Sequence, residues 1–378
     1  MSKRIIALIM TAIMGLSLLA GCKSSAVGGI DPVKNYIAEV SGEKIPSDTY
    51  QYYMANSLIQ YAANVIQYYG SYSDDTLSQI LAQTLEDGTT IADSIKSSLI
   101  DQVKYEYAVN LLFKEYNLAL DVSDEKTIQD AIDNSIKQYG SEENFKDLLS
   151  VFMIDIDSYK NIMSNSLKYQ KLILHLYGTD GVIEKVSEQA VKDYYAANNS
   201  LVKHILINTQ EENLKLATGE TTEEAIAKKK ALANDIYKKV QAGEDFDALL
   251  KQYGEDPGMT SNPKGYVVNE SSSYVEEFKD AALEMKIGEY RLVESDYGYH
   301  IMYRDDVFNA GEFDDLTARI AFKGTDFDKI IQEKIDSLKF TFNDKTMEKL
   351  NPATFKMKSL IDKYQEISEK LNSASTAG

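Results

Sequence analysis

Three histidines offer the clearest chemistry in this 378-residue chain, namely His175, His204 and His300. His204 and His300 each fall in an apolar run typical of a strand, one at the start and one at the end of the same middle segment. Two histidines at the two edges of one small domain could act as a functional pair. A histidine on a strand is more often structural than catalytic, so spacing alone leaves both interpretations open.

Charge and motif content narrow the class of function. The chain has 59 acidic and 40 basic residues, a net charge of −19, which argues against nucleic acid as a partner. No further histidine or cysteine lies near His204 or His300 in the sequence to complete a zinc site. No glycine-rich phosphate-binding loop is present either. The sequence therefore predicts no metal and no cofactor.

The elements that must position His204 and His300 belong to one compact middle segment. The expected elements are strands at 201–207, 291–294 and 299–304 and helices at 222–242, 246–253 and 275–286. A loop at 254–265 holds two of the five prolines. Strands that flank a few helices over so short a stretch predict a small α+β domain.

The flanking regions have the pattern of helices. We expect a short strand at 36–40, then helices as far as residue 200, with Ser47 and Ser187 as N-caps. One stretch carries an apolar residue at every fourth position and predicts a single continuous stripe: Ile91, Ile95, Leu99, Val103, Tyr107 and Leu111. After Gly311 we expect a helix to about residue 339, a short strand at 340–342 and a helix at 352–371.

Tyrosine is abundant, with 26 residues, and tryptophan is absent. Several tyrosines gather between Tyr50 and Tyr72. They are consistent with helix faces bordered by amphipathic rings, or with a groove for unfolded chains, because tyrosine provides contact area at low entropic cost. The first interpretation is the simpler one.

Cys22, the single cysteine, follows a segment with the layout of a secretory signal peptide. Lys3 and Arg4 precede an apolar run that is too short for a permanent transmembrane helix, and small residues follow it. The sequence Leu19-Ala20-Gly21-Cys22 resembles the lipobox of bacterial lipoproteins. This resemblance implies cleavage before Cys22, lipid attachment to Cys22, and a location on the extracytoplasmic face of the cell membrane. An ordinary signal peptide with an incidental cysteine is the alternative.

Five motifs in the middle segment resemble the parvulin family of peptidyl-prolyl isomerases. They occur in the order and spacing of that family over residues 201–306. The motifs are Val202-Lys203-His204-Ile205-Leu206-Ile207, Gly243-Glu244-Asp245-Phe246-Asp247-Ala248-Leu249, Gln252-Tyr253-Gly254-Glu255-Asp256-Pro257-Gly258, Glu277-Phe278-Lys279-Asp280-Ala281-Ala282 and Tyr297-Gly298-Tyr299-His300-Ile301-Met302.

The resemblance implies a role for six residues. The catalytic residues implied are His204 and His300, as paired buried histidines, and Asp256 next to the reacting amide. The substrate-binding residues implied are Phe278 as the aromatic wall of a proline pocket, Tyr274 four positions before it, and Tyr297 three positions before the second histidine. The family's usual apolar leucine after the Asp-Pro loop is replaced by Lys264. This substitution predicts a more open or more polar pocket edge.

The whole chain resembles PrsA-type foldase lipoproteins, with an N-terminal region similar to that of SurA-type chaperones. The resemblance implies a small parvulin-like α+β domain inserted in a mainly helical chaperone module. The organisation implied is a signal peptide at 1–21, a tether at 22–35, a helical chaperone region at 36–200, the isomerase domain at 201–306 and a helical C-terminal segment at 311–371 that packs with the N-terminal region.

Three functions follow as hypotheses. The first is a membrane-anchored foldase that isomerises X–Pro bonds in newly exported proteins and holds unfolded clients. The second is a holdase whose parvulin domain has no catalytic activity. The third, a solute-binding lipoprotein, is the weakest, because the N-terminal half lacks alternating strands and helices. A homodimer remains open.

Overall fold

The computed structural model describes residues 35–375. By the contacts within it, the chain divides into two compact units. The helical unit comprises residues up to Tyr177 and from Thr325 onward, and the α+β unit comprises Gly178–Gly324. The predicted signal peptide, Cys22 and the tether as far as residue 34 lie outside the described residues.

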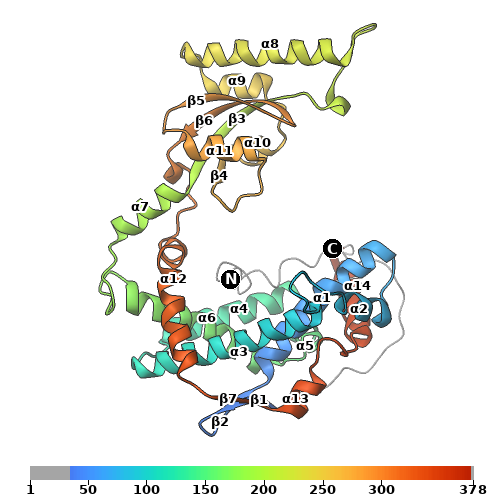
Figure 1. Cartoon of the computed structure of the whole chain (residues 1–378), viewed down its shortest axis with the longest axis vertical. Helices are drawn as coiled ribbons and strands as arrows, with labels where there is room; N and C mark the ends of the chain where they lie inside the picture. The colour runs from blue at the N-terminus through green and yellow to red at the C-terminus, as the bar shows by residue number, and fades with distance from the viewer. Residues whose placement is uncertain (1–34, 376–378) are drawn as a thin grey trace. The chain divides into compact units, whose positions relative to one another are not determined.

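The helical unit contains long helices and one small sheet (Figure 1). Its elements are β1 (Tyr36–Val40), β2 (Glu43–Pro46), α1 (Asp48–Tyr69), α2 (Asp74–Leu81), α3 (Ile91–Glu115), α4 (Val122–Gln138), α5 (Glu142–Val151), α6 (Ile156–Tyr177), the second part of α12 (Asp315–Asp336), β7 (Phe340–Phe342), α13 (Asp344–Lys349) and α14 (Lys358–Ser375).

The small sheet joins the two ends of the described chain. Its strand order is β2-β1-β7, and both neighbours of β1 are antiparallel to it. Val40 pairs with Phe340, and Ala38 pairs with Phe342. Because the whole α+β unit lies between these paired strands in the sequence, it is an insertion in the helical unit. The predicted fold class, a small α+β domain inserted in a mainly helical module, is confirmed.

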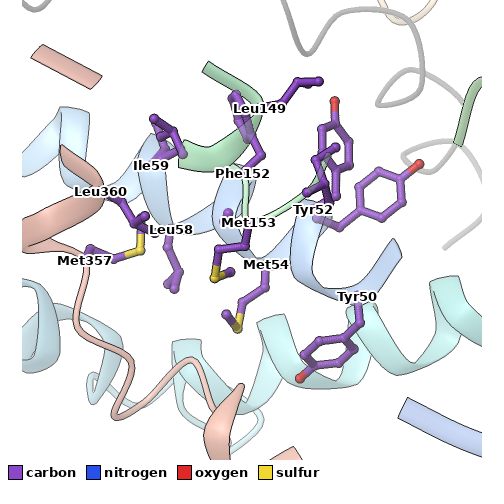
Figure 2. Packing of buried hydrophobic residues seen from close by; sticks show 14 of the residues in the cluster. Tyr50, Tyr52, Met54, Leu58, Ile59, Leu149, Phe152, Met153, Met357 and Leu360 are labelled. Atoms are coloured by element: carbon purple, nitrogen blue, oxygen red, sulfur yellow. The ribbon is translucent and has the colours of Figure 1, made fainter. Parts of the chain in front are cut away.

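Residues from both sides of the insertion form one hydrophobic core in the helical unit. Figure 2 shows Met54 and Leu58 of α1 near Met153, with Met357 and Leu360 from the C-terminal segment packed alongside. All five are fully or almost fully buried. The C-terminal segment is therefore part of the same folded body as the N-terminal helices.

The tyrosines near the N-terminus divide between core and surface. Tyr50, Tyr52 and Tyr53 are buried in α1 and belong to the hydrophobic core. Tyr68 and Tyr69, at the end of the same helix, are 80% and 67% exposed. The simpler interpretation therefore holds for the first three.

Two local expectations need correction. Ser47 precedes α1, but its hydroxyl makes no capping bond and instead pairs with Gln51 Oε1 at 2.9 Å. The apolar stripe of α3 is not continuous, because Tyr107 and Leu111 are only half-buried and Leu112 is buried instead. Each step of four residues turns about 40° past a full helical turn, so a stripe of strict period four rotates away from the core.

The α+β unit contains one four-stranded antiparallel sheet. Its elements are α7 (Glu188–Asn198), β3 (Ser200–Asn208), η3 (Glu211–Asn213), α8 (Thr222–Gln241), α9 (Phe246–Tyr253), α10 (Gly258–Ser261), β4 (Tyr266–Val268), α11 (Glu276–Glu284), β5 (Tyr290–Ser295), β6 (Gly298–Asp305), η4 (Val307–Ala310) and the first part of α12. The strand order is β4-β3-β6-β5.

Helices cover both faces of this sheet (Figure 1). Alternate residues of a strand face opposite sides, so Ile205 and Ile207 pack with α8 and α9 on one face. Val202 and Met302 pack with α11 on the other face. The second face carries the histidines.

The α+β unit extends beyond the predicted limits of 201–306. Its boundaries by contact lie at Gly178 and Gly324, because α7 and the start of α12 pack together. The ring of Tyr194 stacks on Phe322 with centroids 4.7 Å apart, and Lys323 pairs with Glu184 at 2.7 Å. The last helix also differs from the expectation, since it begins at Lys358 and not at residue 352.

Within residues 35–375, the structure contains no helix with the length and apolar character needed to cross a bilayer.

Leu360→Ala tests the shared core. Leu360 is 1% exposed, and removing its side chain is expected to lower the free energy of unfolding of the helical unit by about 2–5 kcal/mol. Urea unfolding followed by far-ultraviolet circular dichroism measures the change. Val122, which is 87% exposed, provides the control, and Val122→Ala is expected to change stability by less than about 0.5 kcal/mol. Equal losses in the two variants would contradict a shared core.

Candidate active site

The pairing of β3 with β6 brings His204 and His300 together. His204 lies opposite Met302, and His300 lies opposite Leu206. The two histidines therefore share one face of the sheet at diagonal positions, within reach of each other. Gly298 permits this pairing to continue to the end of β6, because a Cβ there would lie 2.3 Å from the carbonyl oxygen of Ile207.

A chain of hydrogen bonds passes through the two buried imidazoles. Nδ1 of His204 lies 3.0 Å from Nδ1 of His300, and Nε2 of His204 lies 2.8 Å from Oδ2 of Asp256. At the far end, Nε2 of His300 lies 2.7 Å from the hydroxyl of Ser295. Both histidines are 4% exposed, so these bonds are shielded from water.

The charge of Asp256 defines the direction of its hydrogen bond with His204. The hydrogen bond from His204 is the main factor that lowers the pKa of Asp256 to about 2, so its carboxylate only accepts hydrogen bonds at neutral pH. Burial, assisted by the charge of His204, lowers the pKa of His300 to about 3. Because the ionised carboxylate of Asp256 carries no proton, Nε2 of His204 donates to it.

Two further donors fix the carboxylate of Asp256. The hydroxyl of Tyr266 donates to Oδ2 at 2.8 Å, and the backbone N–H of Gly258 donates to Oδ1 at 2.9 Å. Both bonds also favour the ionised form. Gly258 is needed for this approach, because a Cβ there would lie 1.9 Å from the hydroxyl oxygen of Tyr266.

The neighbouring residue attaches the Asp256 loop to β3. The backbone N–H of Glu255 donates to the carbonyl oxygen of Leu206, and its carboxylate accepts from the N–H of Asn208. Lys229 of α8 pairs with the same carboxylate. Asp256 is therefore held by the strand that also carries His204.

Aromatic rings cover the histidines. The ring of Phe278, from α11, lies with its centroid 5.0 Å from His204 and 5.3 Å from His300. Tyr274 lies 5.5 Å from Phe278 and 5.4 Å from Tyr266. Phe278 is 3% exposed, whereas Tyr274 is 38% exposed. Tyr274 therefore forms the accessible part of this aromatic group.

Tyr297 lies apart from the aromatic group, unlike the other five predicted site residues. Its side chain is 46% exposed, and within the described chain no ring contact joins it to the histidines. Its backbone N–H donates to the Ser295 hydroxyl at 3.2 Å, so Tyr297 acts on the site only through the main chain.

Lys264, which replaces the family's usual leucine, bonds away from the histidines. Its ammonium donates to the carbonyl oxygen of Ala310 at 3.1 Å.

Sequence reasoning missed Tyr266 and Ser295. Ser295 lies at the end of β5, next to the strand of His300, and this neighbourhood depends on strand order. Tyr266 is separated from Asp256 by the turn of α10, and only the folded loop brings the two together. Among residues 35–375, no group of three or more histidine, cysteine, aspartate or glutamate side chains is arranged to hold a metal ion.

Tyr266→Phe tests the hydrogen-bond chain. Losing this hydroxyl is expected to raise the pKa of Asp256 from about 2 toward the ordinary 3.8. The pKa of Asp256 is lower in the folded state than in the unfolded state. Its contribution to the free energy of unfolding is therefore complete above the unfolded pKa and is lost as the pH falls through the folded pKa. The variant should therefore lose its smaller stabilisation at a higher pH. A carboxyl-carbon NMR titration measures the shift.

Tyr274→Phe is the matched control for this measurement. Tyr274 lies in the same aromatic group but makes no hydrogen bond to Asp256 within the described residues. The pKa of Asp256 is expected to stay near its original value in this variant. An equal rise in both variants would contradict the role given to the Tyr266 hydroxyl.

Comparison with known proteins gives a domain match and relatives that cover part or most of the chain. The model of the PPIC-type PPIase domain matches residues 185–307. A Foldase protein PrsA of Geobacillus kaustophilus is 31% identical over 173 residues, which cover 44% of this chain and 54% of that protein. A Foldase protein PrsA of Caldanaerobacter subterraneus is 25% identical over 346 residues, covering 89% of this chain and 94% of the relative. The chain thus spans about half the length of the first relative and nearly all of the second.

Solved structures of similar proteins include PrsA from Bacillus anthracis and from Bacillus subtilis. The first is 22% identical, with a TM-score of 0.26, covering 62% of this chain and 96% of that chain. The second is 17% identical, with a TM-score of 0.23, covering 90% of this chain and 92% of that chain. The domain match and the relatives by sequence agree: residues 185–307 match the PPIC-type, or parvulin-type, isomerase domain, and the chain as a whole is similar to PrsA foldase proteins.

Proposed function

We propose that this protein is a membrane-anchored foldase that isomerises X–Pro bonds in unfolded or partly folded exported proteins. The observation that carries the proposal is the hydrogen-bonded chain from Asp256 through His204 to His300, which lies beneath aromatic rings in the region that matches the PPIC-type domain. We assign the catalytic role to these three residues.

The proposed reaction needs no nucleophile. Rotation about a peptide bond has a barrier of about 18–20 kcal/mol, and X–Pro isomerisation takes tens to hundreds of seconds without a catalyst. A catalyst accelerates it by binding the twisted amide more strongly than the planar one. A rigid, buried set of hydrogen bonds provides an environment that does not reorganise during this step.

Asp256 has the charge that such a step needs. In the planar amide, resonance places negative charge on the carbonyl oxygen, and twisting the bond reduces it. A fixed carboxylate beside that oxygen raises the energy of the planar form more than that of the twisted form. The pKa of about 2 keeps Asp256 ionised at neutral pH, and its bonds to His204 and Tyr266 hold it in place. In this proposal Tyr274 and Phe278 provide the apolar contact for the proline ring.

Asp256→Asn tests the catalytic assignment. Asparagine preserves the shape but removes the charge, so kcat/KM on a proline peptide is expected to fall about tenfold or more, equivalent to about 1.4 kcal/mol. A protease-free isomerisation assay measures the rate, with His300→Ala as a second variant. Asp280→Asn is the control, since Asp280 is an exposed residue of α11. Unchanged rates in both site variants of an active protein would refute the assignment.

A holdase without catalytic activity is the second candidate, and the burial of Phe278 favours it. At 3% exposure this ring offers almost no surface to a proline unless Tyr274 moves. The same assay separates the two candidates. A wild-type protein that suppresses aggregation of an unfolded client but gives no rate enhancement would support the holdase.

We further propose that Cys22 carries the lipid anchor and that residues 22–35 tether the folded part to the extracytoplasmic face of the membrane. The support is the order of a basic start, a short apolar run and Leu19-Ala20-Gly21 before the only cysteine. A foldase held there would meet emerging chains at a high local concentration.

Cys22→Ser tests the anchor. The variant is expected to leave the membrane fraction and to keep its wild-type isomerase rate in solution, because Cys22 lies far from His204 in the sequence. Fractionation of cells followed by immunoblotting measures the distribution. A processed variant that stays in the membrane fraction would refute lipid attachment at Cys22.

A further inference from the structure

The helical unit contains a cavity of about 280 Å³ that none of the proposed roles uses. Its walls come from β2, the first turn of α1, and the facing sides of α3 and α6. The volume is close to the lower end of the range for ligand pockets, about 300–1,000 Å³. The lining is rich in charged and amide side chains, which differs from the apolar core beside it.

Three carboxylates line this cavity, and each already accepts hydrogen bonds. Glu43 accepts from the hydroxyl of Tyr107 at 3.0 Å, and Asp48 accepts from the hydroxyl of Ser158 at 2.5 Å.

The third carboxylate is Glu106. Its carboxylate accepts from Thr49 at 3.1 Å, from Asn165 at 2.7 Å and from Gln102 at 2.9 Å. Burial nevertheless raises the pKa of Glu106, with these donors opposing the shift. Glu106 therefore has little remaining capacity to attract a cation into the cavity.

Lys168, in the same wall, has an ammonium whose bonding is incomplete. Its ammonium has three donors and makes one hydrogen bond, to Oδ1 of Asn110 at 2.7 Å. Within the described residues, no carboxylate lies at ion-pair distance from it. Burial and the charge of Lys114 lower the pKa of Lys168, and the charge of Glu106 opposes this shift.

A half-buried ammonium without an ion-pair partner at contact distance is costly unless a counter-charge can reach it. The cavity provides space for that counter-charge directly beside Lys168. Lys114 also lines the cavity and adds positive potential, because its own pair with Glu43 is loose at 3.7 Å. The amide of Asn161, which makes no hydrogen bond within the described chain, lies in the same wall. It can bond a peptide group next to the bound anion.

We infer that this cavity binds a carboxylate group of an extended peptide, with Lys168 as its ion-pair partner. The carboxylate comes from an acidic side chain or from a chain terminus, since both present the same chemistry. This inference adds a binding preference to the proposed handling of unfolded chains. It does not depend on isomerase activity.

Fluorescence anisotropy with proline-free peptides tests the inference on the purified full-length protein. The first fluorescein-labelled peptide has one internal glutamate and an amidated terminus. The second has glutamine at that position and a free C-terminal carboxylate, and the third has glutamine and an amidated terminus. At least one carboxylate peptide is expected to bind tenfold or more tightly than the neutral peptide, and less tightly as salt rises. Whichever binds better identifies the source of the carboxylate.

Two variants locate the site. Lys168→Gln is expected to weaken binding of the carboxylate peptide at least tenfold. Lys160→Gln, on the same helix but outside the cavity lining, is expected to leave it unchanged. Competition by glutarate, a free dicarboxylate, is expected for a carboxylate site and should also be lost with Lys168→Gln.

Several results would overturn the inference. One is equal affinity for the neutral and acidic peptides, which needs no variant and is independent of any effect on folding. Another is unchanged binding by Lys168→Gln with a native circular dichroism spectrum. Because the peptides lack proline, a failure here leaves the proposed isomerase intact, and loss of isomerase activity with retained peptide binding would leave this inference intact.

Discussion

The antiparallel pairing of β3 with β6 is the interaction on which the candidate site depends. It places His204 and His300 at diagonal positions on one face, although they lie at opposite ends of the domain in sequence. Backbone hydrogen bonds define this register, and a shift by one residue would turn a histidine to the α8 face. The Asp256 loop uses the same strand, because Glu255 bonds the backbone of β3. The loop and both histidines are thereby built on one pair of hydrogen-bonded strands.

The second constraint is that the segments before and after the insertion fold together in the helical unit. β1 and β7 pair although the whole α+β unit separates them in the chain, and α1 and α14 contribute to one core. The α+β unit can thus have its own core while the helical unit keeps the cavity beside Lys168. Each unit therefore has its own group of polar side chains. The α+β unit contains the shielded hydrogen-bond chain through the two histidines, and the helical unit contains the incompletely bonded ammonium of Lys168.

Much of the local structure was predictable because it depends on short-range patterns. The strand at 36–40, the helices at 142–151 and 246–253, and the cap at Ser187 follow from periodicity and capping chemistry. The errors have specific causes. The stripe on α3 failed because a period of four does not match 3.6 residues per turn. The hydroxyl of Ser47 found a buried partner in Gln51, which competes with the capping bond.

The sequence by itself determined the kind of domain, since ordered motifs around His204, Asp256 and His300 identified the resemblance that the domain match supports. It also identified five of the residues that meet in the site. Only the tertiary structure decided how those residues are bonded, because Tyr266 and Ser295 reach them through a folded loop and a neighbouring strand. It also decided that Phe278 is covered and that Lys168 faces a cavity. Burial and unpaired charge arise from the packing of distant segments, which no local pattern specifies.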